Sequence, residues 1–292
     1  MVELPVATRD GHRFTLEAIL PENARARLLW LPALGVSARH YRPIAEALAK
    51  HDVAVFLHEW RGHGSSSLRA GRGCDWGYRE LLLDIETSEA AAAAQAPEVR
   101  RLIGGHSLGG QLAACRLRLD PAAADALWLV ASGAPYWRAF PYPTRCWLPL
   151  AYRFLPWLAR RVGHLPGRRI GFGGSEAAGV MTDWGRSALS GLYAPAGVTA
   201  DLEAGMTCFA GEVRGLALRD DWLGPMSSLL YLTSKLAHAR VALDTLDAGM
   251  LGTVADHYGW MLQPEIVAQA LSAPVDREYS EEPASSSVEA GK

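Results

Sequence analysis

The chain has 292 residues, which is long for one domain and short for two, so one core with a sizeable insertion fits best. Its net charge of −2 gives no electrostatic reason to expect nucleic acid or an anionic membrane as a partner. The first ten residues lack a basic segment before an apolar run, and no 18 consecutive residues are apolar, so we expect a soluble, cytoplasmic protein.

The four cysteines predict neither a disulfide framework nor a zinc site. They are Cys74, Cys115, Cys146 and Cys208, which are widely spaced and contain no C-x-x-C pair. The histidines also lack H-x-H or H-E-x-x-H spacing. We therefore expect no metal and no cofactor.

Strand and helix patterns alternate along most of the chain, which predicts a mostly parallel sheet with helices on both faces. The first two strands should flank the turn at Asp10-Gly11. Predicted strands cover 2–8, 13–20, 28–31, 53–57, the run before Ser107, 126–131, 213–218 and 239–246. Predicted helices cover 41–49, 76–94, 111–117, 227–237 and 264–271.

Residues 135–198 interrupt this alternation with aromatic residues, prolines and arginines. The segment is too long for a loop and too apolar for a linker, so we expect a mostly helical cap over the site. Residues 147–162 could also form an aromatic, basic helix at a membrane surface. Because the same side chains would serve to pack a cap, we do not expect membrane contact. The core is then 1–134 and 199–277, and the polar tail 278–292 is expected to be disordered.

Ser107 lies in the pattern Gly105-x-Ser107-x-Gly109, between an apolar strand and a helical segment. A serine on such a tight turn is lifted out of the sheet, and the helix that follows presents free N–H groups beside it. This geometry suits a nucleophile whose attack creates an oxyanion. A glycine-rich turn that contains a serine by chance is the alternative.

Two later residues complete a possible catalytic set. A serine hydroxyl needs a neighbouring base, and the base needs a carboxylate that fixes its tautomer. Asp221 follows one late strand and His257 follows the last, so the chain order is serine, acid, histidine. Asp220 is an alternative acid, and either aspartate could instead serve a turn or a helix cap. His106 adjoins the serine, but a neighbour in a strand turn points elsewhere.

These motifs resemble the α/β-hydrolase superfamily over nearly the whole chain, and most closely bacterial proteins described only as predicted α/β hydrolases. The matching segments are Leu31 to Val36, Glu59 to Ser66, Gly105 to Gly110, Asp221 to Pro225 and His257 to Trp260. The resemblance implies an α/β-hydrolase fold with a helical cap and an oxyanion hole formed by the backbone N–H groups of Leu34 and Leu108.

The chain departs from the superfamily at two places. Pro32-Ala33 stands where many members have His-Gly, and Glu59 replaces the usual aspartate of a loop that we expect to be structural. The serine at position 107 disfavours the relatives that use an aspartate nucleophile, the dehalogenases and epoxide hydrolases.

The sequence therefore predicts a carboxylesterase-like serine hydrolase. Ser107 would attack an ester or related acyl bond, with Asp221 and His257 completing the triad, and the substrate would be a small molecule with an apolar part. Two alternatives remain open: an acyltransferase that uses the same triad, and a binding protein that keeps the fold without catalysis.

Overall fold

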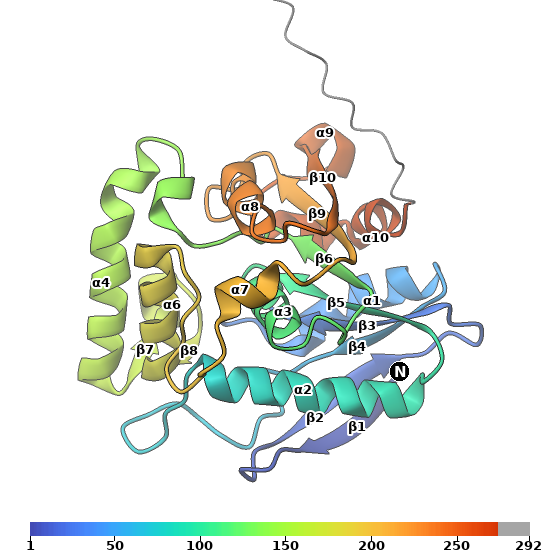
Figure 1. The fold of residues 1–292 in the computed structure, drawn as a ribbon, viewed down its shortest axis with the longest axis horizontal. Helices are drawn as coiled ribbons and strands as arrows, with labels where there is room; N and C mark the ends of the chain where they lie inside the picture. Colours follow the sequence, from blue (N-terminus) through green and yellow to red (C-terminus); the bar gives the residue numbers. More distant parts are fainter. Residues whose placement is uncertain (274–292) are drawn as a thin grey trace, which may run out of the picture.

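The computed structural model describes residues 1–273, which are built around an eight-stranded sheet (Figure 1). Its strands, in spatial order, are β1 (Val2–Ala7), β2 (Arg13–Ile19), β4 (Val53–Leu57), β3 (Ala26–Leu31), β5 (Arg100–His106), β6 (Ala126–Val130), β9 (Glu212–Leu218) and β10 (Arg240–Leu246). The pairs β1–β2 and β2–β4 are antiparallel, and all the others are parallel. The predicted sheet is confirmed, and the carboxyl ends of its parallel strands share one edge.

Helices cover both faces of the sheet because both faces of its central strands are apolar. Leu28 and Trp30 of β3 belong to one core cluster, whereas Leu29 and Leu31 belong to the other. The first cluster also holds side chains of α1 (Arg42–Ala49) and α10 (Pro264–Ser272). The second holds those of α2 (Tyr78–Gln95), α3 (Leu108–Leu119) and α8 (Met226–Thr233). This alternation is the pattern of a buried strand covered on two sides.

Residues 135–198 connect β6 toward β9 and form a group of their own beside the sheet (Figure 1). We call them the inserted segment. It consists of η2 (Trp137–Ala139), α4 (Thr144–Val162), β7 (His164–Pro166), α5 (Gly167–Ile170), β8 (Ser175–Ala177) and α6 (Ala178–Ser190). α4 packs against α6 and β7, and β7 pairs with β8 in a small antiparallel hairpin. The sequence did not indicate that hairpin.

The helix predicted over 227–237 is too long, because α8 ends at Thr233. Beyond it the backbone makes tighter bonds, from Lys235 N to Leu232 O (3.3 Å) and from Leu236 N to Thr233 O (2.9 Å). Such bonds end a helix in a turn. The short elements α7 (Leu202–Met206), α9 (Ala248–Leu251), η1 (Ala38–Tyr41) and η3 (Gly259–Leu262) were also not predicted.

Within residues 1–273, no helix combines the length and apolarity needed to cross a bilayer. The four cysteines are free, and Cys115 is buried. The expected disordered tail, 278–292, lies outside the described residues, as does the last part of the expected core, 274–277.

Candidate active site

Ser107 occupies the turn between β5 and α3 with φ 55° and ψ −118°, a conformation that few non-glycine residues adopt. The glycines around it make room for the neighbouring strand. A Cβ on Gly105 would lie 2.3 Å from the Leu31 carbonyl oxygen, and a Cβ on Gly109 would lie 2.0 Å from it. Both glycines are therefore required by the close passage of β3, and the turn places Ser107 at the start of α3.

His257 and Asp221 come from loops that follow β10 and β9, at the same edge of the sheet. The Nδ1 atom of His257 lies 2.7 Å from Oδ2 of Asp221, and both side chains are buried. The other oxygen of Asp221 accepts hydrogen bonds from the backbone N–H groups of Leu223 (2.8 Å) and Gly224 (2.9 Å). Asp220 is exposed, so it is Asp221 that contacts the imidazole. With Nδ1 engaged, Nε2 is the nitrogen left for other chemistry.

Ser107 and His257 both line one cavity of about 300 Å³. Within residues 1–273 the Ser107 hydroxyl makes no hydrogen bond, so it is not bonded to His257. Catalytic hydrogen bonds often form only when a substrate is bound.

Two backbone N–H groups at the cavity have no hydrogen-bond partner in the described chain. Leu108 is the first residue of α3, where an N–H has no partner within the helix, and Leu34 lies in the loop after β3. Both residues line the cavity. Among the hydrogen bonds of the described chain, none uses the N–H of Leu34 or of Leu108. Unpaired N–H groups of this kind are the donors that an oxyanion hole requires.

The loop that carries Leu34 is fixed by a buried tyrosine. The Ala33 N–H donates to the Tyr41 hydroxyl (2.9 Å), which lies 2.9 Å from Nδ1 of His106. The hydroxyl can donate its own proton to Nδ1 when the imidazole carries its proton on Nε2. Burial holds the pKa of His106 well below its usual value, so this imidazole is neutral and can accept that proton. Tyr41 was not among the predicted site residues, because nothing near it in the sequence shows that its hydroxyl meets Ala33 and His106.

The same loop also touches the inserted segment. Gly35 has φ +80°, and a Cβ there would lie 2.3 Å from the backbone nitrogen of Gly174. Glu176 of β8 accepts from the Gly174 N–H (2.7 Å) and lies 3.3 Å from Nε2 of His63, in the loop after β4. Glu176 was also missed, because nothing near it in the sequence shows that its carboxylate faces the core.

His63 gives this contact a pH dependence. Burial lowers the pKa of His63, but the hydrogen bond to Glu176 and its charge outweigh burial, so the pKa is raised. A histidine with a raised pKa contributes stability that is complete below its ordinary value of about 6.5 and is lost as pH rises through the folded-state pKa.

We therefore expect the wild-type protein to lose thermal stability as pH rises above about 6.5, and the variant His63→Gln to lose less of it. The measurement is the unfolding temperature as a function of pH. His238 is exposed and serves as the control, since His238→Gln should keep the wild-type profile. Equal slopes in the His63→Gln and wild-type profiles would contradict the assignment.

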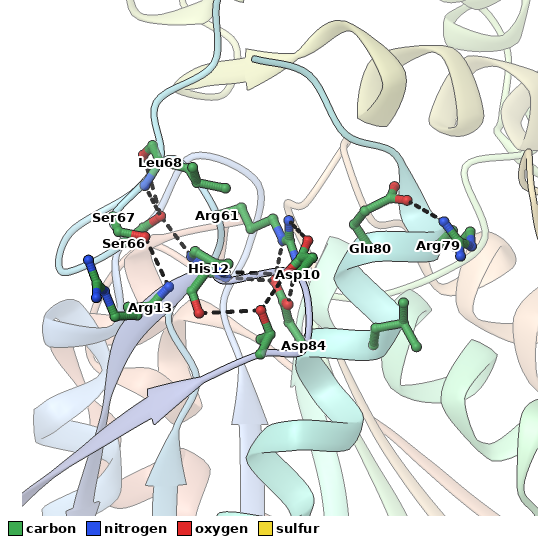
Figure 2. Close-up of polar contacts among 12 residues, drawn as sticks. Asp10, His12, Arg13, Arg61, Ser66, Ser67, Leu68, Arg79, Glu80 and Asp84 are labelled. Carbon is green, nitrogen blue, oxygen red and sulfur yellow. Dashed lines mark hydrogen bonds and ion pairs between the residues drawn. The ribbon is translucent and has the colours of Figure 1, made fainter.

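The rest of the loop after β4 is anchored by a buried charge cluster (Figure 2). Asp84 of α2 binds Arg61 through two hydrogen bonds (2.6 and 2.8 Å) and lies 3.2 Å from His12 Nδ1. Arg61 also pairs with Asp10 (2.7 Å), and the bond it donates holds the pKa of that carboxyl far below its usual value. Ser66 lies 3.0 Å from His12 Nε2. The cluster ties the β1–β2 turn, this loop and α2 together, as expected of a structural loop.

The cavity lies between the sheet and the inserted segment. Its lining from the sheet side includes Leu34, Ser107, Leu108, Gln111 and His257, and its lining from the inserted segment includes Trp147, Leu148, Tyr152, Phe172 and Trp184. Within residues 1–273 no Asp or Glu lines it, and no three His, Cys, Asp or Glu side chains cluster as a metal site would require. The lining is mostly apolar, includes several aromatic side chains and contains no Asp, Glu, Lys or Arg among the described residues.

Comparisons with known proteins agree with this architecture. Residues 22–176, more than half of the chain, match the family described as serine aminopeptidase, S33. No significant match was found among curated proteins.

Solved structures share the fold at low sequence identity. A hydrolase from Pseudomonas aeruginosa PA01 aligns with a TM-score of 0.58 and 20% identity, over 92% of this chain and 96% of its own. A structure from a study of carboxylesterases of the thaumarchaeon Nitrososphaera gargenis aligns with a TM-score of 0.60 and 13% identity, over 92% of this chain and 96% of its own. Est1E from Butyrivibrio proteoclasticus, with ferulic acid bound, aligns with a TM-score of 0.59 and 16% identity, also over 92% of this chain and 96% of its own. The fold is thus that of the α/β hydrolases, and the chain belongs to the S33 serine aminopeptidase family within them.

Proposed function

We propose that this protein is a serine hydrolase that cleaves an ester or related acyl bond through an acyl-enzyme. The observation that carries the proposal is the 2.7 Å contact of His257 Nδ1 with Asp221, in a cavity that His257 shares with Ser107. A serine on a strained turn, an imidazole and a buried carboxylate form the set of groups that nucleophilic catalysis needs.

The proposed reaction runs in two halves. The Ser107 oxygen bonds to the acyl carbon while His257 Nε2 takes the hydroxyl proton, and the N–H groups of Leu34 and Leu108 bind the resulting oxyanion. The bond to the alcohol oxygen then breaks, and His257 returns the proton to the alcohol. Water attacks the acyl-enzyme in the same way, releasing the acid and restoring Ser107. Asp221 orients the imidazole and stabilises its charged form.

The cavity favours a neutral substrate with an apolar or aromatic part. We propose that the inserted segment is a cap domain, since α4 and α6 supply much of the aromatic lining. An aminopeptidase must also stabilise the charged amino group of its substrate, which a buried carboxylate would do. No acidic side chain of the described residues lines this cavity, so we favour esters over peptides with a free amino group. Gln111 lines the cavity, and its buried carboxamide oxygen has no hydrogen-bond partner among the described residues.

Hydrolysis assays test this proposal directly. The p-nitrophenyl esters of acetate, butyrate and benzoate should be cleaved, and alanine p-nitroanilide should not. A fluorophosphonate should label Ser107, as located by peptide mass. Adding an alcohol as acceptor and analysing the products distinguishes hydrolysis from acyl transfer. Absence of fluorophosphonate labelling would contradict an activated serine.

The contact at Gly35 predicts an effect on rate. In Gly35→Ala the new Cβ meets the backbone of Gly174, so the loop must shift and carry Leu34 out of position. Loss of one oxyanion donor costs on the order of 10²–10³ in kcat. Gly11→Ala is the matched control, because Gly11 has a similar φ of +85° but open space around it. Steady-state rates on an ester should fall only in Gly35→Ala, and equal rates would contradict the role of this loop.

A further inference from the structure

The outer face of α4 exposes a stripe of large apolar side chains. Trp147, Leu150, Phe154 and Trp157 are 44%, 72%, 51% and 50% exposed. Their spacing of three, four and three residues places them on one side of the helix, while Leu148, Tyr152 and Ala159 are buried on the other. We call this stripe the outer α4 face. The sequence suggested that the apolar side chains of 147–162 pack a cap. In the structure, the buried side of α4 makes those packing contacts, and the stripe stays exposed.

The exposed charged side chains of the inserted segment are all basic. The inserted segment contains eight arginines and two acidic residues, Glu176 and Asp183, and both acidic side chains are buried. The exposed arginines of α4 and α5 are Arg153, Arg160, Arg161, Arg168 and Arg169. In the described chain none of these five pairs with a carboxylate. The net charge of −2 for the whole chain conceals this local positive surplus.

The outer α4 face borders the rim of the cavity. Trp147 belongs to the stripe and also lines the cavity, and its ring lies 5.9 Å from that of Trp222, which lines the cavity as well. Ile170 lines the cavity and is 43% exposed, next to Arg168 and Arg169. A surface that covered the stripe would therefore lie against the opening of the site.

We propose that the outer α4 face docks on an anionic phospholipid bilayer. Tryptophan and phenylalanine side chains partition into the boundary between headgroups and acyl chains, and arginines beside them bind lipid phosphates. An acidic protein surface would pair with the arginines, but it would not bury the four apolar side chains that project from the exposed side of α4. Docking at the rim would supply the site with amphiphilic substrate, although docking itself does not depend on the proposed chemistry.

Vesicle sedimentation with the full chain tests the proposal. The protein should pellet with vesicles of mixed phosphatidylcholine and phosphatidylglycerol at least about tenfold more tightly than with phosphatidylcholine alone, and salt should weaken the binding. In Arg153→Gln/Arg160→Gln, loss of two charges should weaken binding on the order of tenfold or more. Leu150→Ser/Phe154→Ser should weaken it similarly on the mixed vesicles.

Matched controls lie outside the face. Leu262 is 73% exposed and Arg25 has an exposed side chain, so Leu262→Ser and Arg25→Gln should bind as the wild type does. None of the substituted side chains lines the cavity, so cleavage of a soluble ester should be unchanged in every variant. Wild-type protein that stays in the supernatant at low salt would overturn the proposal, and so would equal losses in the control variants. Dimerisation seen by light scattering and abolished by Leu150→Ser/Phe154→Ser, without vesicle binding, would assign the face to a second copy instead.

Discussion

Ser107→Ala should reduce hydrolysis of p-nitrophenyl butyrate on the order of 10⁴–10⁶-fold. The substitution removes the oxygen that would bond to the acyl carbon and leaves His257 and Asp221 in place. The expected residual rate comes from binding and from the N–H groups of Leu34 and Leu108. Initial rates of ester hydrolysis measure turnover, and fluorophosphonate labelling measures the reactivity of the serine separately.

Ser227→Ala is the matched control for this variant. Ser227 is exposed on α8 and makes no side-chain hydrogen bond in the described chain, so its loss should leave the rate within experimental error of the wild type. A Ser107→Ala rate above about a tenth of the wild type would refute the nucleophile. If neither the wild type nor Ser107→Ala cleaves the ester, fluorophosphonate labelling of the wild type but not of Ser107→Ala still identifies an activated serine with a different substrate.

Asp84→Asn should destabilise the fold by about 3–5 kcal/mol. The Asp84 side chain is completely buried, and its carboxylate faces Arg61 and His12. Removing the charge leaves the Arg61 guanidinium, only 4% exposed, with Asp10 as its remaining carboxylate. Urea unfolding followed by circular dichroism measures the change. An unchanged dependence of the free energy of unfolding on urea concentration would show that the substitution altered stability and not the compactness of the folded or unfolded state.

An exposed ion pair provides the comparison. The Arg25 side chain is 85% exposed and lies 3.2 Å from Asp52, so Arg25→Gln should cost only about 0–1 kcal/mol. A similarly small cost for Asp84→Asn would mean that the buried cluster is not what holds the loop after β4.

The regular elements of the core could be predicted because each depends on local pattern. The apolar run of β4 was predicted at its observed bounds, Val53–Leu57, since a strand buried on both faces shows in sequence as an uninterrupted apolar run. The turn at Ser107 was equally visible, because the glycines that let β3 pass are adjacent in sequence. The hairpin β7–β8 was not, since strands of three residues carry too little pattern to detect.

The candidate site divides in the same way. The residue types of Ser107, Asp221 and His257 and their order were visible in the sequence, but the choice of Asp221 over Asp220 depended on which carboxylate faces His257. Tyr41 and Glu176 could not have been found, because their roles arise from contacts with His106 and His63, which are distant in the chain.

The sequence by itself determined the alternation of strands and helices, the strained serine turn and the candidate catalytic residues, because each follows from spacing within a short stretch of chain. Tertiary structure alone decided which side of α4 is buried, which carboxylate holds the histidine and which loops press on Leu34. Those outcomes depend on surfaces brought together from segments far apart in the chain, whose contact no local pattern encodes.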